Sequence, residues 1–135
     1  PIFNWHGSAS LGAEIDGVPW TADESSIHYV WAVPYNIFSG TANGKGLYIW
    51  LQAVYDSNTY AMGFGNGSYY MIWEDVISYD PIHSYASYNG IYNSGGVFCI
   101  KADSAYMSGL FYFQGQNSQR QIVNIKNGYY NIHKY

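Results

Sequence analysis

Apolar and polar residues alternate along most of this chain, and no long stretch shows the spacing of an amphipathic helix. Tyrosine, valine, isoleucine and tryptophan, which favour strands, recur in short runs separated by glycine and asparagine. The pattern predicts strands at 10–15, 18–22, 27–33, 47–55, 59–64, 68–76, 96–102, 106–114, 121–126 and 129–134. Residues 34–46 and 77–95 are expected to be long irregular connections.

The stretch AEIDGVPWTAD at 13–23 predicts a hairpin with Asp16-Gly17 as its two-residue loop. This register places Ala13 opposite Trp20, a small side chain facing a large one, on the inner side of the sheet. Because Pro19 has no N–H to donate to a ladder, the second strand is expected at a sheet edge. Trp20 is therefore interpreted as a core residue rather than a ligand platform.

A second hairpin is predicted in QIVNIKNGYYNIHK, where Asn127-Gly128 is the dipeptide preferred in type I′ loops. A two-residue loop here pairs Ile125 with Tyr130 and Val123 with Ile132. Both apolar pairs then lie on one face, with polar residues on the other. Turn chemistry and alternation agree, so strands 121–126 and 129–134 are expected to be neighbours.

Alternation also predicts the core. Leu47, Ile49 and Leu51 share one strand face, with Ala53 continuing it, and Met107, Phe111 and Phe113 share another. The run SYYMIWEDV is apolar on both faces, which predicts a strand that is central or covered on both sides. The fold class that follows is a single all-β domain over residues 1–135, either an antiparallel sandwich or a sandwich-like barrel.

Composition excludes several function classes. Charged residues make up only 10 % of the chain and the net charge is −4, which leaves no basic surface for nucleic acid. No apolar run approaches the ~20 residues of a membrane-spanning helix. The one cysteine, Cys99, excludes an internal disulfide and is expected to be a buried, unreactive thiol. The chain begins at Pro1 and is expected to be a mature or trimmed form.

The sequence predicts no catalytic, metal or cofactor site. The four histidines, at positions 6, 28, 83 and 133, have no ligand-like spacing. Glu74 and Asp75 are neighbours on a predicted strand, so their side chains point to opposite faces and cannot act together on one bond. The glycine-rich GFGNGSYY continues as a strand, whereas a phosphate-binding loop must open a helix.

Aromatic residues are the remaining candidates for function, because the chain has 5 Trp, 16 Tyr and 6 Phe among 135 residues. Most are expected to fill the core, but Tyr and Trp also suit contacts with sugar rings and with proteins. The candidate ligand or partner contacts, on outward strand positions and in loops, are Trp31, Tyr48, Trp50, Tyr79, Tyr85, Tyr88, Tyr92 and Tyr112.

Three segments resemble a family of uncharacterised exported Bacteroidetes β-proteins, mostly lipoproteins. The matching residues are Gly17, Trp20 and Ala22 in AEIDGVPWTA; Ser108, Gly109, Phe111 and Phe113 in the 106–114 region; and Asn127, Gly128 and Tyr130 near the end. Lys126, where threonine is usual, and the tyrosine-rich 77–95 depart from the family pattern. The resemblance implies an exported all-β protein with a lipid-anchoring cysteine upstream of Pro1, and it supplies no active site.

Two main hypotheses for function follow. The first is a non-catalytic extracellular or cell-surface module that binds glycan or protein through exposed Tyr and Trp. Its expected location is extracellular, or else the outer membrane or the periplasm. The second is a structural subunit that associates with copies of itself. In that case residues 1–8 form an extended arm, whose apolar part adds as a strand to a neighbour and consists of Pro1, Ile2, Phe3, Asn4 and Trp5. A hydrolase that collects carboxylates from several loops is a third, weaker alternative.

Overall fold

The computed structural model describes residues 7–32, 35–52, 58–62, 69–75, 83–87, 95–102 and 105–134. Within these ranges the chain forms eleven strands and one 3₁₀ turn, η1 (Glu24–Ser26). The strands are β1 (Ser10–Ile15), β2 (Val18–Thr21), β3 (His28–Ala32), β4 (Tyr35–Ala42), β5 (Lys45–Gln52), β6 (Asn58–Met62), β7 (Tyr69–Asp75), β8 (Ser84–Ala86), β9 (Gly95–Ala102), β10 (Tyr106–Gln116) and β11 (Ile122–His133).

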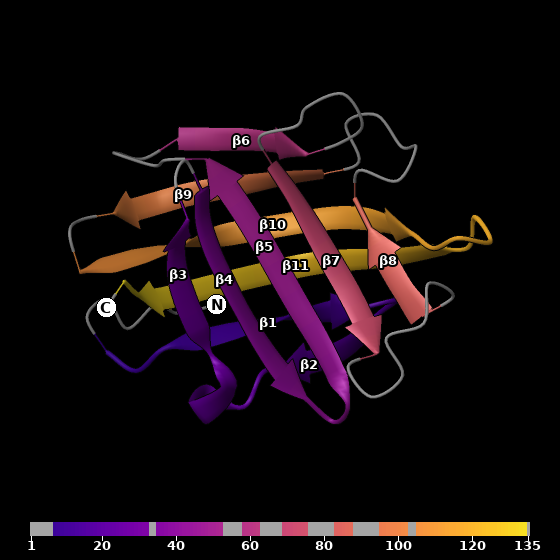
Figure 1. Ribbon diagram of the computed structural model, residues 1–135, viewed down its shortest axis with the longest axis horizontal. Coiled ribbons are helices and arrows are strands. Elements are labelled where there is room, and N and C mark those ends of the chain that lie inside the picture. Colours follow the sequence, from indigo (N-terminus) through magenta and orange to yellow (C-terminus); the bar gives the residue numbers. More distant parts are fainter. Residues whose placement is uncertain are drawn as a thin grey trace.

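The strands form one connected antiparallel sheet in the order β2-β1-β11-β10-β8-β7-β5-β4-β3. The long strand β10 also pairs with β9, which carries β6 at its outer side. The sheet curls into a half-barrel, so that β3, β4, β5 and β7 lie across β1, β11 and β10 (Figure 1). The all-β antiparallel prediction is confirmed. A sandwich of two separate sheets is not confirmed, because the described strands are continuous through β8.

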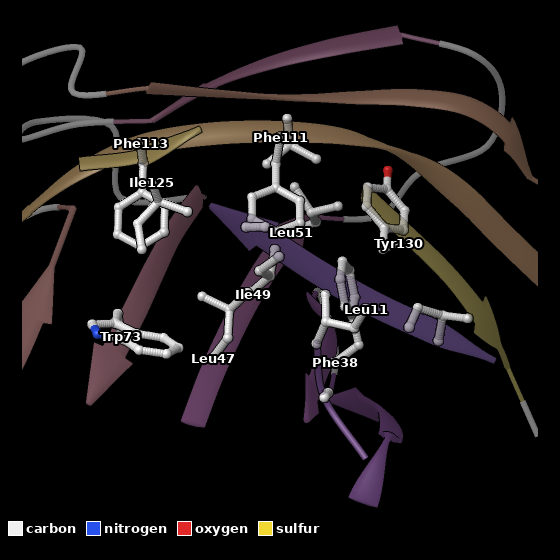
Figure 2. Packing of buried hydrophobic residues seen from close by; sticks show 14 of the residues in the cluster. Leu11, Phe38, Leu47, Ile49, Leu51, Trp73, Phe111, Phe113, Ile125 and Tyr130 are labelled. Atoms are coloured by element: carbon white, nitrogen blue, oxygen red, sulfur yellow. The ribbon is translucent and has the colours of Figure 1, made fainter. Parts of the chain in front are cut away.

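The core lies between the two halves of the curled sheet (Figure 2). The predicted face of β5, with Leu47, Ile49 and Leu51, is fully buried, and the predicted face of β10 is buried with it. Aromatic contacts join the halves, since the rings of Phe38 in β4 and Tyr130 in β11 are 4.8 Å apart. Cys99 is buried as predicted.

The hairpin at Asp16-Gly17 is confirmed in its loop and in its register. Ala13 pairs with Trp20, and β2 lies at the edge of the sheet. Both loop residues have positive φ, 49° and 85°, as a type I′ loop requires. Trp20 is partly buried against the core, and its indole N–H donates to the carbonyl of Ala42 at 3.2 Å.

The hairpin predicted at Asn127-Gly128 is wrong. Residues Ile122–His133 form one strand, β11, which pairs with β10 on one side and β1 on the other. Asn127 does have positive φ, 52°, but it forms a bulge rather than a turn. The extra residue of a bulge shifts the inward and outward alternation of side chains by one position, and a two-residue loop has the same effect. Ile125 and Tyr130 therefore point into the core in either arrangement, and both are buried.

The expectation of an irregular 34–46 segment is also wrong, because β4 and the start of β5 lie there. The inward residues of β4 include Asn36, Gly40 and Ala42, which are small or polar and weaken the apolar alternation. The turn that joins the two strands is Asn43-Gly44, with φ of 53° and 74°. In the other supposed connection, the short strand β8 occupies Ser84–Ala86, and most of 77–95 lies outside the described residues.

Candidate functional site

The bulge in β11 interrupts the ladder on both sides of this strand. On the β10 side the register shifts by one residue between Phe111 and Phe113. Lys126 and Asn127 therefore both lie opposite Tyr112. On the β1 side the register also shifts, between Gly12, which pairs with Tyr129, and Glu14, which pairs with Lys126. A bulge of this kind bends the strand and redirects the neighbouring side chains, and such bulges are often found beside functional sites.

Two contacts hold the bulge in place. The Asn127 side-chain amide donates to the carboxylate of Glu14 in β1, with Nδ2 2.7 Å from Oε2. On the core side Gly128 lies against the ring of Phe111, where a Cβ would be 2.5 Å from Cδ2. Residue 128 is thus required to lack a side chain in this packing, and the bulge is a fixed part of the sheet.

A groove of about 450 Å³ opens beside the bulge on the outer face of β9, β10 and β11. Its walls are mainly apolar. Tyr112 is 49 % exposed and Phe98 is 39 % exposed, and their ring centroids are 6.4 Å apart with 30° between the ring planes. The lining residues are Phe98, Leu110, Phe111, Tyr112, Lys126, Asn127 and Gly128. Two tilted, solvent-accessible aromatic rings side by side form a platform for a flat apolar ligand surface.

A hydrogen bond from a buried tyrosine fixes the backbone of Phe98. The hydroxyl of Tyr130 donates to the backbone carbonyl of Phe98 at 3.1 Å, from the next strand but one. Gly109 makes this approach possible, because a Cβ there would lie 2.6 Å from the same hydroxyl oxygen. The buried tyrosine therefore ties β9 to β11 across β10 and supports one wall of the groove.

Polar groups stand at the rim of the groove. Lys126 is exposed, and its cross-strand neighbour on β1 is Glu14. The lysine charge is therefore accompanied by a carboxylate of opposite sign close by. Asn127 adds an amide whose carbonyl oxygen can accept hydrogen bonds while its Nδ2 is bound to Glu14. The rim offers hydrogen bonds without a strong net charge.

The structure separates the aromatic residues that the sequence suggested as contacts. Tyr112 lies in the groove. Tyr48 and Trp50 lie half-buried on the outer face of β5, in the other half of the sheet, and Trp31 is exposed on β3. Tyr85 belongs to β8 and packs against the core, so its interpretation as a loop residue is wrong. Tyr79, Tyr88 and Tyr92 lie outside the described residues, as do the arm residues Pro1 to Trp5.

The sequence interpretation missed Phe98 and Leu110 as groove residues. A signal for Phe98 was present, because a buried Cys99 places its neighbours Phe98 and Ile100 on the opposite, outer face. Leu110 is the cross-strand partner of Phe98 and shares that face. The pairing of β9 with β10 brings them together.

Other chemistry is sparse in the described ranges. No group of three or more His, Cys, Asp and Glu residues that could hold a metal ion is found among them. Burial raises the pKa of the Tyr29 hydroxyl, which lies on the core side of β3, away from the groove. Over the same residues, no helix has the length and apolar character needed to cross a membrane.

Comparisons of the chain with protein-family models, with curated proteins and with solved structures gave no match.

Proposed function

We propose that this protein is a non-catalytic extracellular binding module that holds a glycan in the groove beside the Asn127-Gly128 bulge. The observation that carries the proposal is the pair of exposed rings, Phe98 and Tyr112, 6.4 Å apart in one groove with polar groups at its rim. Apolar walls with a few placed hydrogen-bonding groups are typical of small-molecule sites.

A sugar ring matches this arrangement better than a fully apolar ligand does. A pyranose presents C–H groups on its faces, which stack on aromatic rings, and hydroxyls around its edge. In the groove, the rings of Phe98 and Tyr112 meet the faces, and Lys126 and Asn127 meet the hydroxyls. Because Glu14 accompanies Lys126, the rim favours a neutral sugar over an acidic one.

The extracellular location is part of the same proposal. The resemblance of the Trp20, Phe111 and Asn127 regions to an exported family supports it, and so does the low charged content of 10 %. The alternative ligand is a protein segment that binds to the same two rings, and a glycan array separates the two possibilities.

The test is a glycan array followed by calorimetric titration with the sugars that bind. Phe98→Ala and Tyr112→Ala are each expected to weaken binding tenfold or more, since each removes one wall of the groove. Ile122→Ala is the matched control, because Ile122 is an exposed apolar residue of β11 outside the groove. Binding that survives both groove substitutions contradicts the proposal, and an array without any binding glycan favours a protein ligand.

A structural subunit joined by strand addition is the second candidate. Gly7 and Ser8, the last residues of the predicted 1–8 arm, are held on this chain's own β11, where His133 Nε2 lies 2.5 Å from the Gly7 carbonyl oxygen and Asn131 Nδ2 donates to the Ser8 carbonyl oxygen, so these two residues do not extend to a neighbour. A donor arm at 1–5 would start from this fixed point and pair with a sheet edge of the next copy. Deletion of residues 1–5 is expected to abolish any filaments seen by negative-stain microscopy and to leave the chain folded.

A further inference from the structure

Among the described strands, β3 lies at an end of the sheet order. Within the part of the chain that the structure describes, β3 pairs only with β4. Four of its five residues are exposed, including Val30 at 55 % and Trp31 at 48 %. Natural edge strands are usually protected by lysine, proline or a bulge, because unpaired N–H and C=O groups recruit other strands. The β3 sequence HYVWA has none of these protections.

The strand at the opposite end of the main strand order, β2, is protected. This strand has only four residues and contains Pro19, which cannot donate to a new ladder. Its Val18 is 66 % exposed and so is more accessible than Val30. The two edges thus differ in their pairing capacity and not simply in exposed apolar surface.

An apolar row leads to β3 on the outer face of the sheet. Val30 pairs with Ile37 on β4, and Ile37 pairs with Trp50 on β5, so the three side chains are cross-strand neighbours. On the inner face of β3, Tyr29 packs against the core, and Trp31 follows it towards the end of the strand.

β3 is complementary to itself in an antiparallel register centred on Val30. With a two-fold axis at this residue, Val30 meets Val30 of the second copy, and Tyr29 meets Trp31. The outer row then continues without a break from Trp50 of one copy to Trp50 of the other. The inner faces bring two Tyr–Trp pairs together, and aromatic cross-strand pairs are among the stabilising ones.

Charge does not oppose this contact. β3 contains no Lys, Arg, Asp or Glu, so two copies can approach edge to edge without repulsion between ionised side chains of the strand. The groove at Phe98 and Tyr112 lies on β9 and β10, in the other half of the sheet, and stays accessible.

We propose that β3 is a homodimerisation edge, at which two copies of this chain join their sheets by antiparallel β3–β3 pairing about Val30. The occupant is a second copy. An isologous contact of this kind closes on itself, so it yields a dimer and not a filament. The inference is independent of the proposed glycan site.

The first experiment measures the mass of the full chain in solution by size-exclusion chromatography with light scattering, over a range of concentrations up to about 1 mM. The wild-type protein is expected to shift from monomer to dimer. Val30→Lys introduces a charge on each copy at the two-fold axis and is expected to weaken dimerisation at least tenfold. Val18→Lys makes the same change on the β2 edge and is expected to leave the dimer intact.

The second experiment captures the register by a disulfide. Directly opposed residues in antiparallel strands have Cα atoms about 4.5–5.5 Å apart, within the range of about 4.4–6.8 Å that a disulfide spans. Val30→Cys is therefore expected to form a covalent dimer under mild oxidation, whereas Val18→Cys is not. The native Cys99 is buried and does not compete.

Four results overturn the proposal: a monomer at every concentration, a dimer that Val30→Lys leaves unchanged, a dimer lost equally with Val18→Lys, or open-ended polymers. The last of these favours strand addition by the N-terminal arm. Circular dichroism on both lysine variants separates loss of pairing from loss of fold.

Discussion

Gly128 and Phe111 are opposed across the β10–β11 ladder, and the phenylalanine ring occupies the space that a side chain at 128 would need. A Cβ on Gly128 would lie 2.5 Å from Cδ2 of the ring. The ring is buried and belongs to the central core cluster, so it cannot swing out into solvent. The bulge that opens the groove therefore depends on a glycine packed against an aromatic ring.

Gly128→Ala is expected to destabilise the protein by about 1–3 kcal/mol, because the added methyl group overfills a packed region. Urea unfolding followed by tryptophan fluorescence measures the effect. Phe111→Leu supplies the matched background, since the smaller side chain leaves room for the methyl group. The cost of Gly128→Ala is expected to be smaller in that background, and equal costs would show that the ring does not oppose the substitution.

The dipeptides Asp16-Gly17 and Asn127-Gly128 show why part of the fold could be predicted from the sequence and part could not. At Asp16-Gly17 the turn is formed by local chemistry, and the predicted register with Ala13 opposite Trp20 is correct. At Asn127-Gly128 the local chemistry is similar, since both Asp16 and Asn127 adopt positive φ. The two segments differ in the strands that pair with them. β11 lies between β1 and β10, and pairing on both sides keeps the chain extended through the bulge.

The candidate site was predictable only in part for a related reason. Alternation along β10 places Tyr112 outside, opposite the buried Phe111 and Phe113, and this is local information. The groove also needs Phe98 from another strand and the bulge from a third. Which strands are neighbours is decided by long-range pairing, and single-strand patterns do not contain it.

Trp20 joins the β2 edge to the opposite half of the sheet. Its indole N–H donates to the Ala42 carbonyl at 3.2 Å, and its ring meets Trp73 edge to face at 5.0 Å. Trp20→Phe removes the hydrogen bond but keeps an aromatic ring, so a loss of about 0.5–1.5 kcal/mol is expected in urea unfolding. Trp31→Phe, at an exposed position, is expected to change stability by less than about 0.5 kcal/mol at low protein concentration. Similar losses for the two variants would contradict a special role for Trp20.

Asn117 organises the connection between β10 and β11. Its carbonyl Oδ1 accepts from the backbone N–H groups of Gln119 at 3.0 Å and Gln121 at 2.8 Å, and its Nδ2 donates to the Gln121 side chain. The residue is buried, so Asn117→Ala leaves these donors without their partner and is expected to cost about 1–3 kcal/mol. Thermal unfolding measures the loss.

Asn117→Asp is the comparison variant, because it keeps the acceptor oxygen, although its carboxylate replaces the amide nitrogen and adds a charge at a buried position. It is expected to lose less stability than Asn117→Ala. If both variants lose the same amount, the retained acceptor oxygen gives no net stabilisation in the presence of the buried charge, and the two backbone bonds do not decide the effect.

The hydroxyl of Tyr29 donates to Oδ1 of the buried Asn36, with 2.5 Å between the oxygens, and fastens the edge strand β3 to β4. Tyr29→Phe leaves the Asn36 oxygen without this donor, so a loss of about 1–3 kcal/mol is expected at pH 7.

The effect of Tyr29→Phe is also expected to depend on pH. Burial raises the pKa of Tyr29 above its ordinary value of 10.0 in the folded state. The stabilisation is therefore fully present below pH 10 and is lost as the pH rises through the higher folded-state value, because the unfolded chain releases this proton first. The stability gap between wild type and Tyr29→Phe should narrow above pH 10, as measured by urea unfolding in a series of alkaline buffers. Tyr112→Phe, which removes an exposed hydroxyl, controls for the general alkaline loss, and a gap of constant size for Tyr29→Phe would contradict the proposed role of the buried hydroxyl.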